Sequence, residues 1–248
     1  MTKGLDLRGQ YSHAVFFDLD GVIIDSAPLI IDIIQKMLID RGFTADSELI
    51  KKFVGPPLEE SFAILLDSIG EPSNNQNAAE WSKEFRSFYQ TRYQETKTYK
   101  KIDEMLLEIS EKLPCAIATS KSQEFANAIL KNLKIDHFFT VVAGTEPHWQ
   151  DKSKLTVLKN ALSSLNVALH TNLTGKNCIM IGDRYHDIEA ANALAMVSIG
   201  VTWGVGEHEE IINSEPDFIV DKPSSVTKLI PIITKNNNKR RIVNKWQL

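Results

Sequence analysis

Six short apolar runs, most of them continuous, constrain the fold of this 248-residue chain more than any other feature. A strand with water on one face alternates apolar and polar residues, whereas a strand covered on both faces is apolar throughout. The runs therefore predict the buried strands of a parallel sheet. They are Ala14–Phe17, Cys115–Ala118, Phe138–Ala143, Cys178–Ile181, Met196–Val201 and Phe218–Val220.

Helical patterns separate the later runs, so strand and helix alternate from about Cys115 onward. Apolar residues recur at helical spacing within residues 125–133, 155–165 and 188–195. This alternation predicts an α/β fold built on a doubly wound, Rossmann-like parallel sheet.

The stretch from about Ala27 to Tyr99 breaks the alternation. It has helix-type apolar spacing and no clear strand, and two segments divide it, Gly55–Pro57 and Glu71–Asn77. An all-helical insertion behind the first strand is best explained as a separate cap domain. We expect a core of residues 1–26 and 98–234, a helical cap of residues 27–97 and a flexible basic tail of residues 235–248.

The composition, with 43% apolar and 24% charged residues, is ordinary for a soluble globular protein. Five of the 28 basic residues, but none of the 32 acidic ones, lie in residues 235–248. The rest of the chain is therefore more acidic than the formal charge of −4 indicates, which does not suggest nucleic-acid binding.

Two further features bear on where the protein works. No apolar stretch approaches the ~20 residues of a membrane helix, and residues 1–13 lack the apolar region of a signal peptide. Cys115 and Cys178 each lie inside an apolar run, as buried thiols in a reducing compartment do. We expect a cytoplasmic protein that has no membrane partner.

Polar side chains follow three of the predicted strands at the point where each strand ends. Asp18 and Asp20 follow the first strand, Thr119 and Ser120 end the second, and Asp183 follows the fourth. In open α/β sheets, ligands bind outside the carboxyl ends of the strands. A single aspartate there is more often a turn former or a helix N-cap. Three of them at one edge favour a common site.

Asp18 and Asp20 are two residues apart on an extended segment, so their side chains point to the same side. Two carboxylates that close repel one another unless a cation or a shared proton intervenes. A divalent cation resolves the repulsion, and Asp183 adds a third carboxylate. Mg²⁺ fits, because it takes one or two carboxylates together with waters and a substrate phosphate.

The same residues resemble the motifs of the haloacid dehalogenase superfamily. Asp18–Ser26 (DLDGVIIDS) resembles its first motif, DxDGxxxDS, and Ala116–Ser120 resembles its second, an apolar strand ending in Thr or Ser. Gly182–Asp187 (GDRYHD) resembles its fourth, GDxxxD. The likeness spans about residues 13–222. It implies a magnesium-dependent phosphatase with a helical (C1-type) cap, acting on a small phosphorylated metabolite through an aspartyl-phosphate.

The resemblance and the chemistry of the residues together imply a role for each. Asp18 is the nucleophile, because an ionised carboxylate attacks phosphorus without a separate base. Asp20 protonates the leaving oxygen and then takes a proton from water. Thr119 and Ser120 bind the phosphoryl group, although a strand-end turn explains Thr119 equally well. By the resemblance, the metal ligands are Asp18, Asp183 and the backbone carbonyl of Asp20.

The family's third motif supplies a lysine, and its usual KPxP pattern is absent here. Residues 153–162 resemble a variant of the motif that favours Lys154, with Ser153 as a helix N-cap, and Lys152 stays open as an alternative. Asp187 is placed to orient the lysine or a metal-bound water. It also suits the N-cap of the next helix, and its two oxygens allow both roles.

Within the insertion, residues 53–62 resemble the cap segment of phosphoglycolate phosphatase-like members of the superfamily. Gly55 and Pro56 would then form a rigid loop that faces the substrate. A plain connector between two helices explains them equally well.

Several other activities are compatible with parts of this pattern. A halide-removing enzyme needs neither Asp20 nor a metal, so Asp20 and Asp183 count against it. A phosphosugar mutase shares all the motifs and is not excluded. A phosphonate-cleaving member needs a cap lysine for a Schiff base, for which Lys51 and Lys52 are candidates. A catalytically silent binding module on the same fold is disfavoured by the complete residue set. The sequence names neither the physiological substrate nor the oligomeric state.

Overall fold

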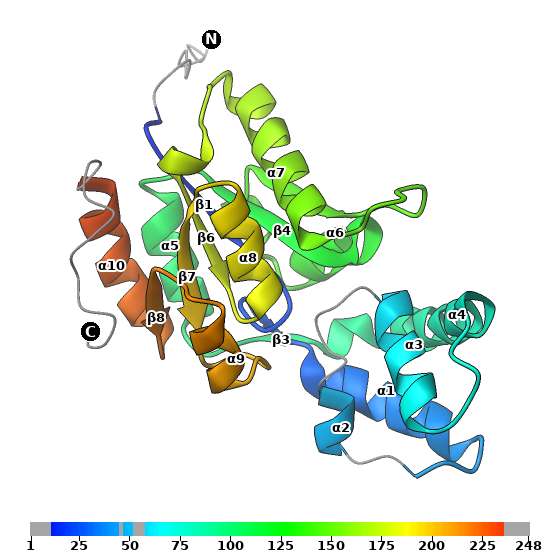
Figure 1. The fold of residues 1–248 in the computed structure, drawn as a ribbon. Coiled ribbons are helices and arrows are strands. Elements are labelled where there is room, and N and C mark those ends of the chain that lie inside the picture. Colours follow the sequence, from blue (N-terminus) through cyan, green and yellow to red (C-terminus); the bar gives the residue numbers. More distant parts are fainter. Residues whose placement is uncertain (1–10, 45–46, 52–57, 236–248) are drawn as a thin grey trace.

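The computed structural model describes residues 11–44, 47–51 and 58–235 (Figure 1). Six strands form one parallel sheet in the order β5-β4-β1-β6-β7-β8, so the sheet expected from the sequence is confirmed. The strands are β1 (Ala14–Phe17), β4 (Cys115–Ser122), β5 (Val141–Thr145), β6 (Cys178–Gly182), β7 (Val197–Val201) and β8 (Phe218–Val220).

The strand bounds depart from the apolar runs at two places. The run from Phe138 becomes a strand only at Val141, because Asp136–Phe138 form a 3₁₀ turn, η2. Conversely, β4 continues past its apolar run to Ser122, and its register with β5 shifts between Ala118 and Ser122.

Helices cover both faces of the sheet, which is why its strands are apolar throughout. Val15 and Phe17 pack into a core with α5 (Ile102–Ser110), α6 (Gln123–Asn132) and α10 (Pro223–Lys235). Ala14 and Phe16 point the other way, into a core with α7 (Lys154–Leu169) and α8 (Tyr185–Ala193). The remaining short elements are α9 (His208–Asn213), η1 (Tyr93–Glu95) and η3 (Gly175–Asn177).

Four helices lie together beyond the carboxyl edge of the sheet (Figure 1). Aromatic rings pack between two of these helices, with Phe62 and Phe85 at 5.9 Å between centroids, and Phe85 stacks on Tyr89 of its own helix at 5.5 Å. The division of the chain into a core and a cap domain stays a prediction. The helices are α1 (Ala27–Ile39), α2 (Ser47–Lys51), α3 (Leu58–Ser68) and α4 (Asn75–Arg92).

Two short strands, β2 (Ile24–Asp25) and β3 (Lys97–Thr98), pair antiparallel where the chain passes from the sheet to the helices and back. The sequence pattern predicts no strand here, because two residues are too few to show an alternating pattern.

Both cysteines are buried and free, Cys115 in β4 and Cys178 in β6, as expected from their apolar runs. Burial raises the pKa of each thiol to about 12. Within the described residues, no helix has both the length and the apolar character needed to cross a bilayer.

Candidate active site

The carboxyl ends of three adjacent strands, β4, β1 and β6, bring the predicted residues together. Asp18 follows β1 directly, and its N–H donates to the Ile181 carbonyl at 2.9 Å, which extends the pairing with β6. At the end of β4, the Gln123 side chain spans the register shift. Its amide donates to the Val142 carbonyl at 3.0 Å and its Oε1 accepts the Gly144 N–H at 2.8 Å. The irregular end of β4 is thereby held in place.

Lys154 lies between two buried carboxylates. Its Nζ is 2.7 Å from Asp18 Oδ1 and 2.7 Å from Asp187 Oδ1, and its side chain is 4% exposed. Ser153 caps α7 as expected, with its Oγ accepting the Thr156 N–H at 3.3 Å. Of the two lysines that the sequence leaves open, Lys154 is the one that contacts the strand-end carboxylates. Lys152 is partly exposed and lines a neighbouring pocket.

Asp187 uses its two oxygens for different partners. Helix α8 begins at Tyr185, so Asp187 is the third residue of the helix and the expectation that it is the N-cap is wrong. Its Oδ2 accepts the Arg184 N–H at 3.2 Å, which still satisfies the start of the helix. The other oxygen, Oδ1, faces Lys154. The structural role and the lysine-orienting role are therefore compatible.

Asp183 is fully buried and is held by backbone groups. Its Oδ2 accepts N–H groups of Val205 at 2.8 Å and of Gly206 at 3.3 Å. Its Oδ1 has no hydrogen-bond partner among the described atoms. Gly21, with φ of +81°, and Gly204 approach so closely that a Cβ on either would lie within 3.0 Å of the Asp183 carboxylate. Only glycine fits on these two sides of Asp183.

Three carboxylates form a group that could hold a cation. Asp18, Asp183 and Asp187 each offer an oxygen, and these atoms all lie within 4.8 Å of one another. The Asp20 carboxylate is not in this group, although the sequence placed it beside Asp18. It accepts a hydrogen bond from the Ser26 hydroxyl, and its Oδ1 is 3.2 Å from Lys121 Nζ.

Burial dominates the electrostatics of the site. It raises the pKa of Asp18 to about 7, with Lys154 opposing the rise and Asp187 adding to it. Burial, together with Asp187 and Asp18, raises the pKa of Asp183 well above its ordinary value. When Asp20 and the three grouped carboxylates are all ionised, they face two ammonium groups, those of Lys121 and Lys154, which leaves an excess of two negative charges. A divalent cation would balance that excess.

The predicted phosphate-binding residues of β4 lie next to this group. Thr119 is buried inside β4, and its Oγ1 accepts the Lys121 N–H at 3.2 Å, which is the side-chain hydrogen bond of the structural alternative, without a turn. The hydroxyl keeps its own proton for a further acceptor. Ser120 is partly exposed and lines the neighbouring pocket. Gly55 and Pro56 lie outside the described residues.

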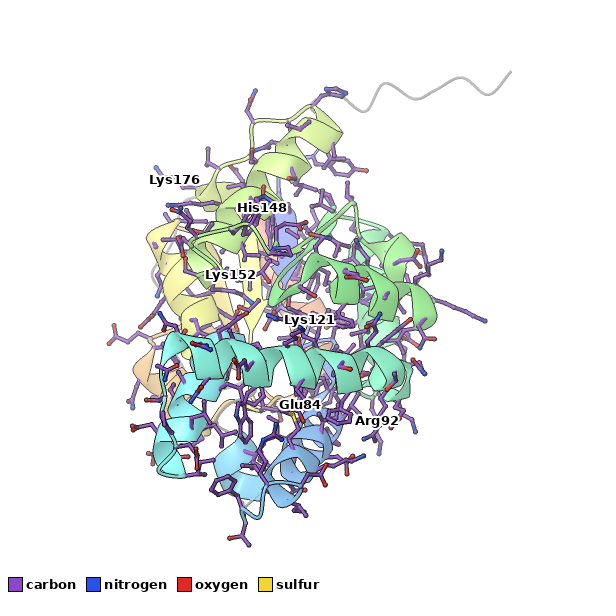
Figure 2. All side chains as sticks on the ribbon, turned by 90° about the vertical axis from the view of Figure 1, so that its right-hand side faces the viewer. Glu84, Arg92, Lys121, His148, Lys152 and Lys176 are labelled. Carbon is purple, nitrogen blue, oxygen red and sulfur yellow. The ribbon has the colours of Figure 1, made fainter. Side chains whose placement is uncertain are left out.

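The roles predicted from the sequence do not include Lys121, Ser26 or Tyr89. Lys121 donates to the Tyr89 hydroxyl at 3.2 Å and lies 4.6 Å from the centre of its ring. Tyr89 belongs to α4, and Lys121 lies on the side of that helix that faces the sheet (Figure 2). Lys121 thus joins Asp20 to the helical group. The position of Lys121 directly after Thr119 and Ser120 could have marked it in the sequence as a site residue. No such signal in the sequence marks Tyr89.

A sequence model of the haloacid dehalogenase-like hydrolases matches residues 15–201, which is more than half of the chain. The chain belongs to this family. The pyrophosphatase PpaX of Listeria monocytogenes is 30% identical over 231 residues, which cover 87% of this chain and 95% of its own length. A predicted phosphatase from Clostridium acetobutylicum is 29% identical and has a TM-score of 0.79, covering 90% of this chain and 99% of its own.

Two more distant structures share the fold. A predicted phosphoglycolate phosphatase from Haemophilus somnus and a β-phosphoglucomutase from Clostridium difficile are each 21% identical, with TM-scores of 0.72. They cover 89% and 90% of this chain, and 98% and 97% of their own lengths. The family model and the relatives at 29–30% identity confirm the family and the phosphatase type of enzyme expected from the sequence, and the shared fold confirms the fold class.

Proposed function

We propose that this protein is a Mg²⁺-dependent phosphatase that hydrolyses a small phosphorylated metabolite in the cytoplasm through an aspartyl-phosphate on Asp18. The observation that carries the proposal is the position of Lys154, buried between Asp18 and Asp187 at 2.7 Å from each. The ammonium group of Lys154 lies where it can balance the negative charge of the Asp18 nucleophile and that of an incoming phosphoryl group. In this proposal residues 27–97 form the cap domain, with Gly55 and Pro56 in its substrate loop.

In the first step, the Asp18 carboxylate attacks phosphorus, and the bond from phosphorus to the leaving oxygen breaks. Asp20 donates a proton to that oxygen, so the product leaves as an alcohol. Thr119 donates its hydroxyl proton to a phosphoryl oxygen, and Ser120 binds beside it. Lys154 stabilises the negative charge that builds up on the phosphoryl oxygens.

In the second step, a water molecule attacks phosphorus of the aspartyl-phosphate while Asp20 takes a proton from the water. The bond between phosphorus and the Asp18 oxygen breaks, and inorganic phosphate leaves. Asp18 is then a carboxylate again and Asp20 is protonated for the next cycle. Asp187 keeps Lys154 in position throughout, since Lys154 Nζ lies 2.7 Å from its Oδ1.

The residues present fit a divalent metal ion. The partnerless, buried Oδ1 of Asp183 and the excess of negative charge both call for a cation. Oxygen-only ligands suit Mg²⁺. Asp18 and Asp183 would hold the ion with the backbone carbonyl of Asp20, and Asp187 would contact Lys154 or a bound water. When bound, the ion would neutralise phosphate charge.

Replacement of Asp18 tests the proposal directly. The variant Asp18→Asn should release no phosphate from p-nitrophenyl phosphate, while circular dichroism shows an unchanged fold. Asp67→Asn, which changes an exposed acid of α3, is the matched control and should keep wild-type activity. Turnover by Asp18→Asn, or equal turnover by the wild type in EDTA and in Mg²⁺, would contradict the proposal. Asp20→Asn should accumulate a phospho-enzyme after rapid quenching, and its absence would remove the role given to Asp20.

The mutase alternative differs only in the fate of the aspartyl-phosphate. A mutase transfers the phosphoryl group to a second sugar hydroxyl, whereas a phosphatase releases inorganic phosphate to water. Assays of inorganic phosphate with a sugar phosphate as substrate therefore separate the two. For the phosphonate-cleaving alternative, Lys51 lines a different pocket, together with Tyr99 and Trp203. Lys52 lies outside the described residues.

A further inference from the structure

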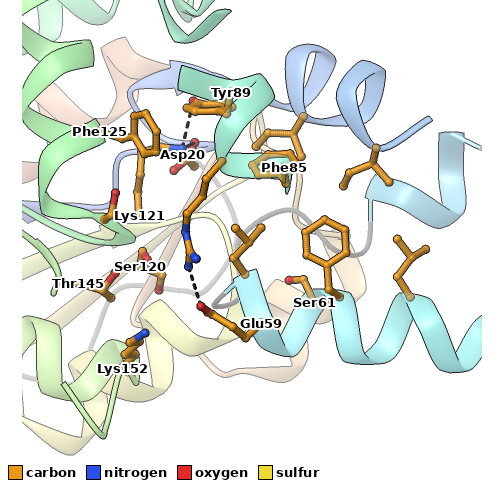
Figure 3. Close-up of a pocket in the computed structure, with 17 residues that line it drawn as sticks. Asp20, Glu59, Ser61, Phe85, Tyr89, Ser120, Lys121, Phe125, Thr145 and Lys152 are labelled. Atoms are coloured by element: carbon orange, nitrogen blue, oxygen red, sulfur yellow. Dashed lines mark hydrogen bonds and ion pairs between the residues drawn. The ribbon is translucent and has the colours of Figure 1, made fainter. Parts of the chain in front are cut away.

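A pocket lies between the helical group and the carboxyl edge of the sheet (Figure 3). Its volume is about 110 Å³. Asp20 and Ser120 form its boundary with the proposed site, whereas Asp18 and Asp183 do not line it. A leaving group whose oxygen receives a proton from Asp20 would extend into this pocket. Its lining therefore bears on which alcohol the enzyme releases.

Most of the surface of the pocket is apolar. The helices contribute aliphatic and aromatic side chains from several directions, and these side chains offer no hydrogen bonds to a polar or charged group. The apolar lining residues are Ile30 and Ile34 of α1, Leu58, Phe62 and Leu65 of α3, Phe85 of α4 and Phe125 of α6.

Two of the three cations that line the pocket are already paired with carboxylates. Lys121 already contacts Asp20 at 3.2 Å and donates to the Tyr89 hydroxyl. The guanidinium of Arg86 contacts Glu59 Oε1 at 2.6 Å, and the dashed lines of Figure 3 mark these pairs. The third cation, Lys152, is partly exposed to water. A second anionic group that binds Lys121 or Arg86 would compete with the carboxylate that each of them already contacts.

We propose that this pocket holds an apolar, uncharged leaving group, so that the preferred substrate is the phosphate monoester of an aromatic or branched aliphatic alcohol. The inference rests on the proposed phosphatase function and narrows its substrate class. Each methylene buried against the lining strengthens binding roughly fourfold. Pyrophosphate, whose leaving group is itself an anion, gains nothing from these contacts. The proposed substrate, a phosphate monoester, therefore differs from the pyrophosphate in the name of the Listeria relative.

Three substrates of similar size test the inference on the full chain with Mg²⁺. They are benzyl phosphate, pyrophosphate and phosphoglycolate, and the measurement is kcat/KM from phosphate release. We expect benzyl phosphate to exceed each of the others at least about tenfold. A value for pyrophosphate or phosphoglycolate equal to or above that for benzyl phosphate overturns the inference. Absence of Asp18-dependent phosphate release from all three would instead contradict the proposed phosphatase function.

A pair of variants tests the role given to the ion pair. Glu59→Gln removes the carboxylate that neutralises Arg86, so kcat/KM for pyrophosphate should rise relative to that for benzyl phosphate. The rise should be only about three- to fivefold, because the pair is partly exposed. Glu60→Gln removes the same charge from the next residue, which is exposed and does not line the pocket. If the ratio of kcat/KM for pyrophosphate to kcat/KM for benzyl phosphate were equal in the two variants, Glu59 would not discriminate against anionic leaving groups.

Discussion

Replacement of Lys154 by Met measures how much the buried cation contributes to stability. Met keeps most of the length of the side chain and removes its charge. Lys154 Nζ lies 2.7 Å from both Asp18 and Asp187, and only 4% of the side chain is exposed, so water cannot replace it. Removal of one partner from a buried ion pair costs about 3–5 kcal/mol. This is a large fraction of the about 5–15 kcal/mol by which domains are stable.

The stability that Lys154→Met loses should depend on pH in the metal-free protein. Burial raises the pKa of Asp18 from 3.8 to about 7, and Lys154 opposes that rise. A carboxyl group with a raised pKa binds more protons in the folded state than in the unfolded state. Stability therefore falls as the pH rises from 3.8 to about 7 and levels off above. Without Lys154 the pKa of Asp18 rises further, so the deficit of the variant grows with pH.

Urea unfolding in EDTA at about pH 5, between the two Asp18 pKa values, and at about pH 8, above both, measures the stability loss and its pH dependence. Lys152→Met is the matched control, because Lys152 is partly exposed and its loss should change the free energy of unfolding by at most about 0.5 kcal/mol. If Lys154→Met were as stable as Lys152→Met at the higher pH, or lost more stability at the lower pH, the account of the buried pairs would be wrong.

Two further replacements address the neighbouring groups. Gly21 and Gly42 both have φ of +81°, so Ala at either position should cost about 1–2 kcal/mol of backbone strain. Of these two glycines, only Gly21 would bring a Cβ against the Asp183 carboxylate, so Gly21→Ala should cost about 1–3 kcal/mol more than Gly42→Ala. Equal losses of stability on thermal unfolding would contradict this crowding. Lys121→Met removes the contact that positions the Asp20 carboxyl group, so it should lower kcat on benzyl phosphate about 10- to 100-fold. The loss should be smaller on p-nitrophenyl phosphate, because its leaving group needs no proton. Equal losses on both substrates would show that Lys121 does not position Asp20.

The sequence predicted those parts of the site that depend on where a strand ends. Asp18, Thr119 and Asp183 each follow or end an apolar run, and parallel strands bring their carboxyl ends to the same edge. Lys154 was favoured by a motif and by Ser153, whose capping role is local in the chain. Such features need only a few neighbouring residues to be recognised.

Contacts between distant elements could not be predicted in the same way. Tyr89 reaches Lys121 because α4 lies across the sheet edge, and nothing in the local sequence of α4 records that placement. The carboxylate of Asp20 turns to Lys121 instead of sharing a cation with Asp18, which depends on how β4 leaves its regular register. The start of α8 at Tyr185 was misplaced because Asp187, although a good N-cap by residue type, has its own N–H bonded to the Arg184 carbonyl.

The strand order determines when the enzyme can first work during its own synthesis. β1 is made first, yet its neighbours in the sheet are β4 and β6, whose residues Ile117 and Ile181 lie opposite Phe17. Pairing of this kind closes long loops and is slow, because the chain must lose entropy before the contacts form. A nascent chain that ends before β6 holds Asp18 without Asp183 or Asp187. Phosphatase activity should therefore appear only after β6 and the residues that follow it are in place, and no N-terminal fragment that ends before β6 should show it.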